Sequence, residues 1–164
     1  MIFRHHHADG IASRAGFSDC GRWRYLLERR WAPGSGLVWV MLNPSTADEM
    51  RNDPTIERCQ RRAVRLGFGA MRIVNLFAWR ATDPRDLRRA ADPIGAENDA
   101  ALRDAALWGD QILCGWGVHG AYLGREAQVQ AMLGADLWHL GLTQGGHPRH
   151  PLYVSYAVAP QPWR

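Results

Sequence analysis

The chain contains no lysine, and all twenty of its basic residues are arginine. Cysteine is also scarce: Cys20, Cys59 and Cys114 lie far apart and are odd in number. That spacing fits neither a disulfide framework nor a Cys-x-x-Cys metal site. We therefore expect reduced cysteines, no metal site and no cofactor.

Long apolar runs are absent too. The longest strongly apolar run, residues 37–42, covers six residues, far short of the ~20 that span a bilayer. Met1 to Phe3 leads directly into Arg4 and three histidines, which does not resemble a signal peptide. We expect a soluble, cytoplasmic protein that has no membrane partner.

No internal repeat, low-complexity segment or Pro/Gly-rich linker divides the 164 residues. Their 46% hydrophobic and 22% charged content is typical of globular proteins. We expect residues 21–164 to form a single domain. Residues 1–20 show no hydrophobic periodicity, and we expect them to be a loose N-terminal arm.

Positive charge is concentrated in the first part of the chain. Residues 1–90 hold 16 arginines and 9 acidic residues, a net charge of +7, whereas residues 91–164 hold 4 and 7, a net charge of −3. The absence of lysine fits a GC-rich genome, which favours arginine codons. The uneven distribution permits a phosphate-bearing partner, which we expect to be a nucleic acid or a nucleotide.

From residue 37 onward, apolar runs alternate with helical patterns. We expect buried strands over residues 37–42, 71–77, 111–116 and 136–142. We expect helices over residues 53–66, 83–90, 96–108 and 121–133, the first of them with Asp53 as N-cap and Pro54 in its first turn. Two segments are less regular: an edge strand or hairpin arm over residues 22–31, and a further strand or a packed arm over residues 152–158.

Strands that alternate with helices form βαβ units, and right-handed crossovers make the strands parallel. We therefore expect an α/β protein: a single-domain, three-layer α/β/α fold with a central four-stranded, mainly parallel sheet. In such sheets ligands bind beyond the carboxyl ends of the strands. Four loops follow the expected strands and should meet there: residues 43–52, 78–82, 117–120 and 143–150.

The first of these loops begins where the first strand stops. The amide of Asn43 would project into the crevice, and Pro44 would fix the turn. Ser45, Thr46 and Asp48 add two hydroxyls and a carboxylate. Asn-Pro followed by Ser or Thr is also ordinary turn and capping chemistry, so a ligand site and a simple turn both remain open.

The second strand carries Asn75 inside an apolar run, near its carboxyl end. An amide in a buried strand must find partners or cost about 1–3 kcal/mol of stability. Because it supplies a donor and an acceptor side by side, an amide is also suited to read the edge of a base. Phe77 and Arg80 follow, and they either stack on a planar ligand or pack against a neighbouring loop.

The third and fourth loops add candidate ligand contacts. Trp116 and Gly117 lie in a Gly-Trp-Gly turn, where glycine lets the backbone approach a ligand closely. The fourth loop contains two His-Pro pairs, which begin at His147 and His150, with Arg149 between them. A histidine held by rigid neighbours is a candidate acid, base or anion stabiliser; a solvent-exposed loop histidine is the alternative.

The helix expected over residues 53–66 carries four arginines on one face, opposite a face of mainly apolar residues: Arg58, Arg61, Arg62 and Arg65. Two interpretations stay open. The arginines either form a solvated face that keeps the helix soluble, or they make a stripe that contacts phosphates.

Several segments together resemble the domain of unknown function 1643 family of bacterial and phage proteins, a name that brings no established activity. These segments are RYLLERRW (24–31), MLNPSTAD (41–48), DPTI (53–56), NLFAWRATDPRDL (75–87), DPIGAEND (92–99), GWG (115–117) and PRHPLY (148–153). The resemblance extends from about residue 20 to the end of the chain.

The order of these motifs also resembles, more distantly, the uracil-DNA glycosylase superfamily, whose enzymes have a parallel α/β sheet. Asn43-Pro44 is similar to the first-strand turn of its mismatch-specific branch, and Asn75 to the second-strand asparagine that reads the base. The turn at residues 115–117 is similar to a Gly-rich turn after the third strand. His150-Pro151 is similar to the terminal His-Pro loop, with His147-Pro148 as its rival.

This resemblance implies an N-glycosidase that takes a nucleotide out of the stack and grips its modified base. Asn75 would read the base edge, and His150 would stabilise the charge that develops on the departing base. Asn43 or Asp48 would position the attacking water, and arginines of the first half would hold phosphates.

One departure from the superfamily leaves the activity open. Asn43 stands where the main uracil branch has an aspartate that activates water, so the chemistry is either slow or different. The alternative is a non-catalytic module that binds nucleic acid or a nucleotide in the same pocket. A third interpretation is a small-molecule hydrolase. No wedge motif for opening a duplex is recognisable, which leaves single strands and free nucleotides as candidate substrates.

Overall fold

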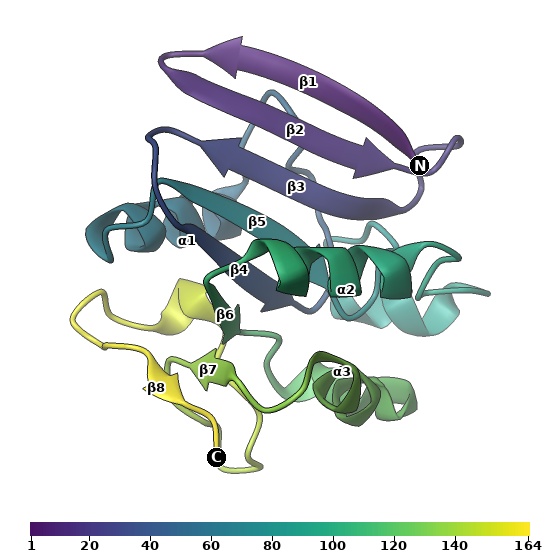
Figure 1. Cartoon of the computed structure of the whole chain (residues 1–164). Helices are drawn as coiled ribbons and strands as arrows, with labels where there is room; N and C mark the ends of the chain where they lie inside the picture. Colours follow the sequence, from purple (N-terminus) through teal and green to yellow (C-terminus); the bar gives the residue numbers. More distant parts are fainter.

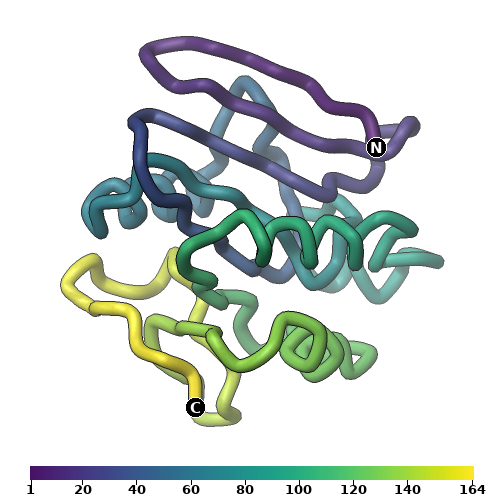
Figure 2. The backbone as a smooth tube through the Cα atoms, in the orientation of Figure 1, coloured from purple at the N-terminus to yellow at the C-terminus, as the bar shows by residue number.

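One sheet of eight strands runs through the computed structural model, which describes residues 1–164 (Figure 1). The strands are β1 (Ile2–Ala8), β2 (Ile11–Phe17), β3 (Arg24–Arg30), β4 (Gly36–Met41), β5 (Ala70–Asn75), β6 (Gln111–Cys114), β7 (Leu137–His139) and β8 (Gln161–Pro162). Their order across the sheet is β1-β2-β3-β5-β4-β6-β7-β8, so the two ends of the chain lie at opposite edges (Figure 2).

The sheet is mixed, and the expected three-layer α/β/α fold with a four-stranded, mainly parallel sheet, like that of the uracil-DNA glycosylases, is therefore wrong. Four pairings are antiparallel: β1-β2, β2-β3, β3-β5 and β7-β8. The parallel pairings join β5, β4, β6 and β7, which correspond to the four expected apolar strands. Continuous apolar runs mark strands buried on both faces, and β1 to β3 have no such run because charged and polar residues interrupt them.

Residues 1–20, expected to be a loose arm, contain the hairpin of β1 and β2. Asp9 and Gly10 connect its strands, and both have a positive φ, of 54° and 76°, as the two central residues of a type I′ turn require. Ala15 and Phe17 of β2 are buried in the core. The hairpin extends the sheet beyond β3, which is an interior strand because it pairs with both β2 and β5.

The two faces of the sheet are covered by different helices (Figure 1). α1 (Pro54–Arg65) packs on one face, and α2 (Asn98–Trp108) and α3 (Arg125–Leu133) pack on the other. Three short 3-10 helices complete the fold: η1 (Pro84–Arg89), η2 (Val118–Gly124) and η3 (Pro151–Tyr153). No helix combines the length and the apolar character that crossing a bilayer requires.

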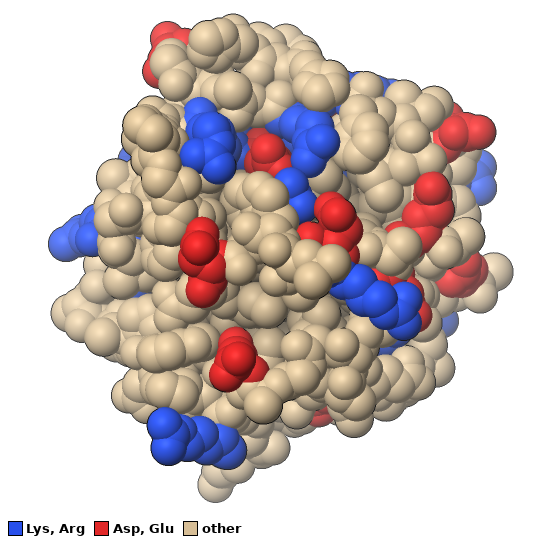
Figure 3. Space-filling view, viewed as in Figure 1, with Lys and Arg blue, Asp and Glu red and all other residues tan.

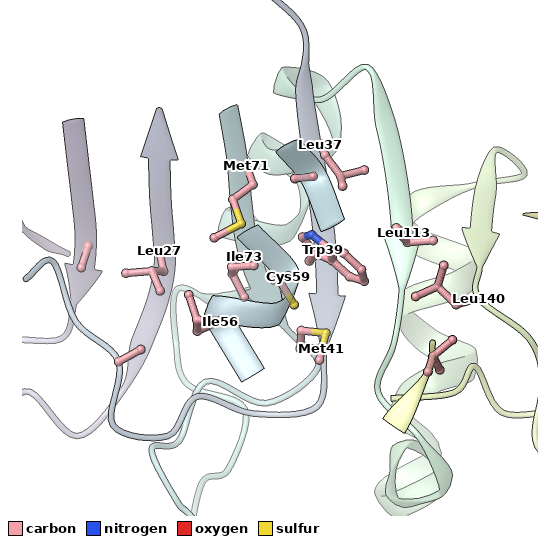
Figure 4. Packing of buried hydrophobic residues seen from close by; sticks show 14 of the residues in the cluster. Leu27, Leu37, Trp39, Met41, Ile56, Cys59, Met71, Ile73, Leu113 and Leu140 are labelled. Atoms are coloured by element: carbon pink, nitrogen blue, oxygen red, sulfur yellow. The ribbon is translucent and has the colours of Figure 1, made fainter. Parts of the chain in front are cut away.

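The start of α1 agrees with the expectation from the sequence. The side chain of Asp53 accepts a hydrogen bond from the backbone N–H of Ile56 at 2.9 Å, and Pro54 is the first helical residue. Ile56 and Cys59 pack among the side chains of the central strands. Ile56 and Met41, the last residue of β4, lie at the same end of this cluster (Figure 4). The first turn of α1 therefore lies near the carboxyl ends of the parallel strands.

The arginine face of α1 packs against the C-terminal segment. Arg58 donates to the carbonyl oxygens of Pro151 and Val154 at 3.0 and 2.6 Å. Arg62 is 2% exposed and donates to three carbonyl oxygens of residues 154–158, each at 3.0 Å. The guanidinium groups of Arg58, Arg62 and Arg65 lie over the ring of Tyr156. Residues 154–158 are therefore a packed arm rather than a strand.

Replacing Arg62 with alanine should destabilise the fold, because its three hydrogen bonds to carbonyl oxygens of the C-terminal segment would be lost. We expect a loss of roughly 2–3 kcal/mol in the free energy of unfolding and a Tm lower by about 4–12 °C. Arg61→Ala is the matched control, since Arg61 is exposed and pairs only with Glu57, and we expect it to change stability by less than about 1 kcal/mol. Equal effects of the two substitutions in chemical denaturation would contradict this role of Arg62.

Candidate functional site

A cavity of about 690 Å³ opens at the carboxyl ends of the parallel strands. Each of the four loops expected to meet there contributes to its wall: residues 43, 45 and 46 from the first, 81 and 82 from the second, 117–119 from the third, and 143, 149 and 150 from the fourth. The ends of β4 and β5 and the first turn of α1 form its floor and one side, through Met41, Ile73, Asn75, Pro54 and Ile56. The cavity suits a small organic ligand, because 300–1,000 Å³ is the usual size of such sites.

Asn75 is the last residue of β5 and is 1% exposed. Strand alternation places it on the α1 face with Met71 and Ile73, and its side chain lines the cavity. Neither its amide nitrogen nor its amide oxygen has a hydrogen-bond partner within the protein. A buried amide left without partners costs about 1–3 kcal/mol, so the fold retains beside the cavity a polar group that the protein itself does not satisfy.

His150 is a half-buried histidine in the cavity wall. Its Nδ1 accepts a hydrogen bond from the backbone N–H of Leu152 at 3.3 Å, so the neutral ring carries its proton on Nε2. Burial lowers the pKa of His150, and the nearby carboxylate of Asp53 partly opposes this shift. The ring is therefore neutral at pH 7 and has one N–H left to donate.

His147, the rival histidine, does not line the cavity. Its Nδ1 lies 2.9 Å from a carboxylate oxygen of Glu126, and the same oxygen accepts a hydrogen bond from the indole N–H of Trp116 at 2.9 Å. Glu126 thus holds the side chains of His147 and Trp116 in place through one carboxylate oxygen. Of the two His-Pro pairs, the structure brings only the one that begins at His150 to the cavity.

Asn43 links two of the loops. Its amide nitrogen donates to the carbonyl oxygens of Ala81 at 2.6 Å and of Pro44 at 3.0 Å, and the hydroxyls of Ser45 and Thr82 add a second link at 3.2 Å. The amide oxygen of Asn43 has no hydrogen-bond partner in the protein and remains an acceptor in the cavity wall.

Several other predicted site residues have structural roles instead. One carboxylate oxygen of Asp48 accepts the backbone N–H groups of Met50 and Arg51 at 2.8 and 2.9 Å, which makes Asp48 a turn residue outside the cavity. Phe77 is buried in the core. Arg80 donates to the backbone carbonyl oxygens of Ser45 and Gly21. The predicted residues that do line the cavity are Asn43, Ser45, Thr46, Asn75, Trp116, Gly117, Arg149 and His150.

Two charged residues of the cavity were not among the predicted site residues. Asp53 is the only carboxylate in its wall; one of its oxygens caps α1, and no protein donor binds the other. Arg24, the first residue of β3, is 1% exposed and lines the same cavity. The sequence contains a signal for both, since they lie in the RYLLERRW and DPTI segments. It predicts Asp53 only as a helix cap, and Arg24 only as one of the first-half arginines that would hold phosphates.

No group of three or more His, Cys, Asp and Glu side chains is placed so that it could hold a metal ion. Cys59 and Cys114 are buried in the core, and burial raises the pKa of both thiols. Basic and acidic side chains alternate on the face seen in Figure 3, where they form no continuous basic surface.

The family model described as "Protein of unknown function (DUF1643)" matches residues 24–152. Because this match covers more than three quarters of the chain, the protein belongs to that family. No curated protein and no solved structure was found to match the chain. The comparisons thus do not show the more distant similarity to the uracil-DNA glycosylases.

Replacing Asn75 with leucine should leave the fold as stable as before, or stabilise it by about 1–2 kcal/mol, because two unpaired polar atoms disappear. Asn98→Leu is the matched control. The amide nitrogen of Asn98 donates to the carbonyl oxygens of Asn75 and Leu76, both at 3.0 Å, and only its amide oxygen is unpaired, so its loss should cost about 1–2 kcal/mol. Chemical denaturation of the two variants checks this difference, and equal destabilisation would mean that Asn75 is satisfied within the protein.

Stability should fall as the pH decreases through the range in which His150 titrates. Because the pKa of His150 is lower in the folded protein than the ordinary value of about 6.5, the unfolded chain binds the proton first. Its contribution is therefore complete above about pH 6.5 and is lost as the pH falls through the lower folded-state pKa.

We expect His150→Asn to lose less stability than the wild type between pH 7 and pH 5, as measured by urea denaturation at each pH. Asparagine keeps an acceptor for the N–H of Leu152 but does not titrate. His5→Asn, at an exposed position of β1, serves as the control and should follow the wild-type curve. A His150→Asn variant that also follows the wild-type curve would contradict the burial of a neutral His150.

Proposed function

We propose that this protein binds a nucleobase in the cavity and hydrolyses the N-glycosidic bond between the base and its sugar. The observation that carries the proposal is the unpartnered amide of Asn75, a residue of the cavity wall. Protein atoms cover this amide, so base binding includes a small movement that brings it to the cavity surface. An amide presents a donor and an acceptor side by side, which matches the edge of a base. The apolar side chains of Met41, Ile56 and Ile73 offer surfaces for the faces of a planar ring.

The groups needed for glycosidic hydrolysis line the same cavity. As the bond between C1′ of the sugar and the base nitrogen breaks, its electron pair moves onto the base. The Nε2–H group of His150 donates a hydrogen bond to an oxygen of the departing base and stabilises this charge. A neutral imidazole suits this role, because it donates without releasing a full proton.

Water then forms the new bond to C1′. The free carboxylate oxygen of Asp53 accepts a proton from this water, and the amide oxygen of Asn43 accepts its second hydrogen and orients it. The proton passes finally to the base, which leaves as a neutral molecule. In this proposal Asp53 takes the part that the resemblance to the uracil-DNA glycosylases implies for Asn43 or Asp48.

A nucleic acid or a nucleotide is the proposed partner. Arg58 and Arg62 are occupied by carbonyl oxygens of the C-terminal segment, which leaves only Arg61 and Arg65 of the predicted arginine stripe exposed. Arg149 is exposed and lines the cavity, so it is the better candidate for a phosphate contact at the rim.

The second candidate function is a module that binds the same ligands without catalysis. The amide nitrogen of Asn43 is occupied by two carbonyl oxygens, and an uncharged amide cannot take a proton from water. Asp53 separates the two functions, since only the glycosidase requires its free carboxylate oxygen.

Labelled single- and double-stranded oligonucleotides that carry uracil, hypoxanthine or a hydroxymethylated pyrimidine test the activity. After incubation and alkali treatment, we expect strand cleavage at one modified base. Asp53→Asn should reduce the rate by a factor of 100 or more, while its Tm stays near that of the wild type because asparagine caps helices as well as aspartate.

Asp53→Ala is the companion variant, because it removes both the carboxylate and the cap and should lower the free energy of unfolding by about 1 kcal/mol. Equal cleavage by the wild type and Asp53→Asn would exclude Asp53 as the base. Saturable binding to one modified oligonucleotide without any cleavage would favour the binding module.

A further inference from the structure

Arg24 is a buried arginine that lacks a negative partner. Its Nη1 donates to the carbonyl oxygen of Ala47 at 2.6 Å, but it forms no ion pair with a carboxylate, and its Nε has no hydrogen-bond partner. Two other buried arginines have carboxylate partners: Arg72 pairs with Glu28 and Asp104, and Arg125 pairs with Asp99. Arg29 and Arg62 form no ion pair either, but each donates three or more hydrogen bonds within the protein, whereas Arg24 donates one.

The unpaired edge of the Arg24 guanidinium has a defined geometry. Because Nη1 is held by Ala47, the free donors are Nε and Nη2, which point in the same direction along one edge of the group. That edge binds the two oxygens of a carboxylate or phosphate through two parallel hydrogen bonds. Burial lowers the pKa of Arg24 to about 9, so the group is still charged at neutral pH.

The surroundings of Arg24 favour an anion on the cavity side. The first turn of α1 contributes Pro54, Thr55 and Ile56 to the wall, and the positive end of a helix dipole favours negative charge there. Asp53 lines the cavity too, but it forms no ion pair with Arg24, and one of its oxygens is used by the cap of α1. A buried cation without a partner is costly, and a negative ligand group would offset that cost.

We propose that Arg24 is the receptor for an oxyanion, a carboxylate or a phosphate, that the ligand of this cavity carries beside the edge recognised by Asn75. The inference rests on the proposed binding of a nucleobase and names the class of ligand: a base with an acidic substituent, or a nucleotide whose phosphate enters the cavity. Protein atoms cover Nε, so binding includes a small movement of the guanidinium toward the cavity.

Isothermal titration calorimetry of the whole chain tests this inference with four probes: uracil, 5-carboxyuracil, uridine 5′-monophosphate and ribose 5-phosphate. We expect one of the two anionic base-containing probes to bind at least about 10-fold more tightly than uracil, the gain of one charge-assisted hydrogen bond. The identity of the tighter-binding probe distinguishes a carboxylate on the base from a phosphate on the sugar.

Three variants locate the receptor. In Arg24→Gln the preference for the anionic probe should fall below about 3-fold, while Arg24→Lys, which keeps the charge but not the two-donor edge, should retain an intermediate preference. Arg24→Lys also keeps a donor for Ala47, which covers the case in which Arg24→Gln does not fold. If Arg149→Gln loses the preference for the anionic probe and Arg24→Gln keeps it, the proposal is overturned, and Arg149 at the rim of the cavity binds the anion instead.

The remaining outcomes separate this inference from the proposed function. One outcome is that uracil binds, that its binding requires Asn75, and that both anionic probes bind with the same affinity as uracil. The role of Arg24 is then wrong, and base binding stands. If ribose 5-phosphate binds as tightly as uridine 5′-monophosphate and requires Arg24, the oxyanion site stands and base recognition fails. If no probe binds at 10 mM, both are wrong.

Discussion

The parallel pairing of β4 with β5 on one side and β6 on the other is the constraint on which the rest of this structure depends. All six residues of β4 are buried, so helices must cover both faces of the sheet at this point. Parallel pairing also brings the carboxyl ends of these strands to one edge, where their loops meet. The cavity, its buried amide at Asn75 and the first turn of α1 are placed by this arrangement.

Seven of the twenty arginines of this lysine-free chain donate to backbone carbonyls. Arg24 and Arg29 bind carbonyl oxygens of the loop at residues 43–52, and Arg58 and Arg62 bind those of the C-terminal segment. The planar guanidinium has five N–H donors in fixed directions, which a lysine ammonium cannot reproduce. Six of the sixteen arginines in residues 1–90 therefore hold backbone segments in place, and the excess positive charge of this half is weak support for binding to nucleic acid.

The polar groups of the cavity differ in how many of their hydrogen bonds the protein itself provides. His150 and Asn43 each use one atom to hold a loop and leave another atom free, and Asp53 divides its carboxylate in the same way between the cap of α1 and the cavity. Asn75 and the Nε of Arg24 have no partner in the protein. A site in which structure fixes the direction of each side chain, and leaves the opposite side open, is preorganised for a ligand.

The sequence alone determined the four apolar strands, the start of α1 at Asp53 and the meeting of four loops, because apolar runs, caps and turn residues act over short distances. Only the tertiary structure decided that β1 and β2 join the same sheet, that Arg24 reaches the cavity and that His150 rather than His147 lines it. These outcomes depend on pairing and packing between segments far apart in the chain, and hydrophobic periodicity contains no information about which segments meet.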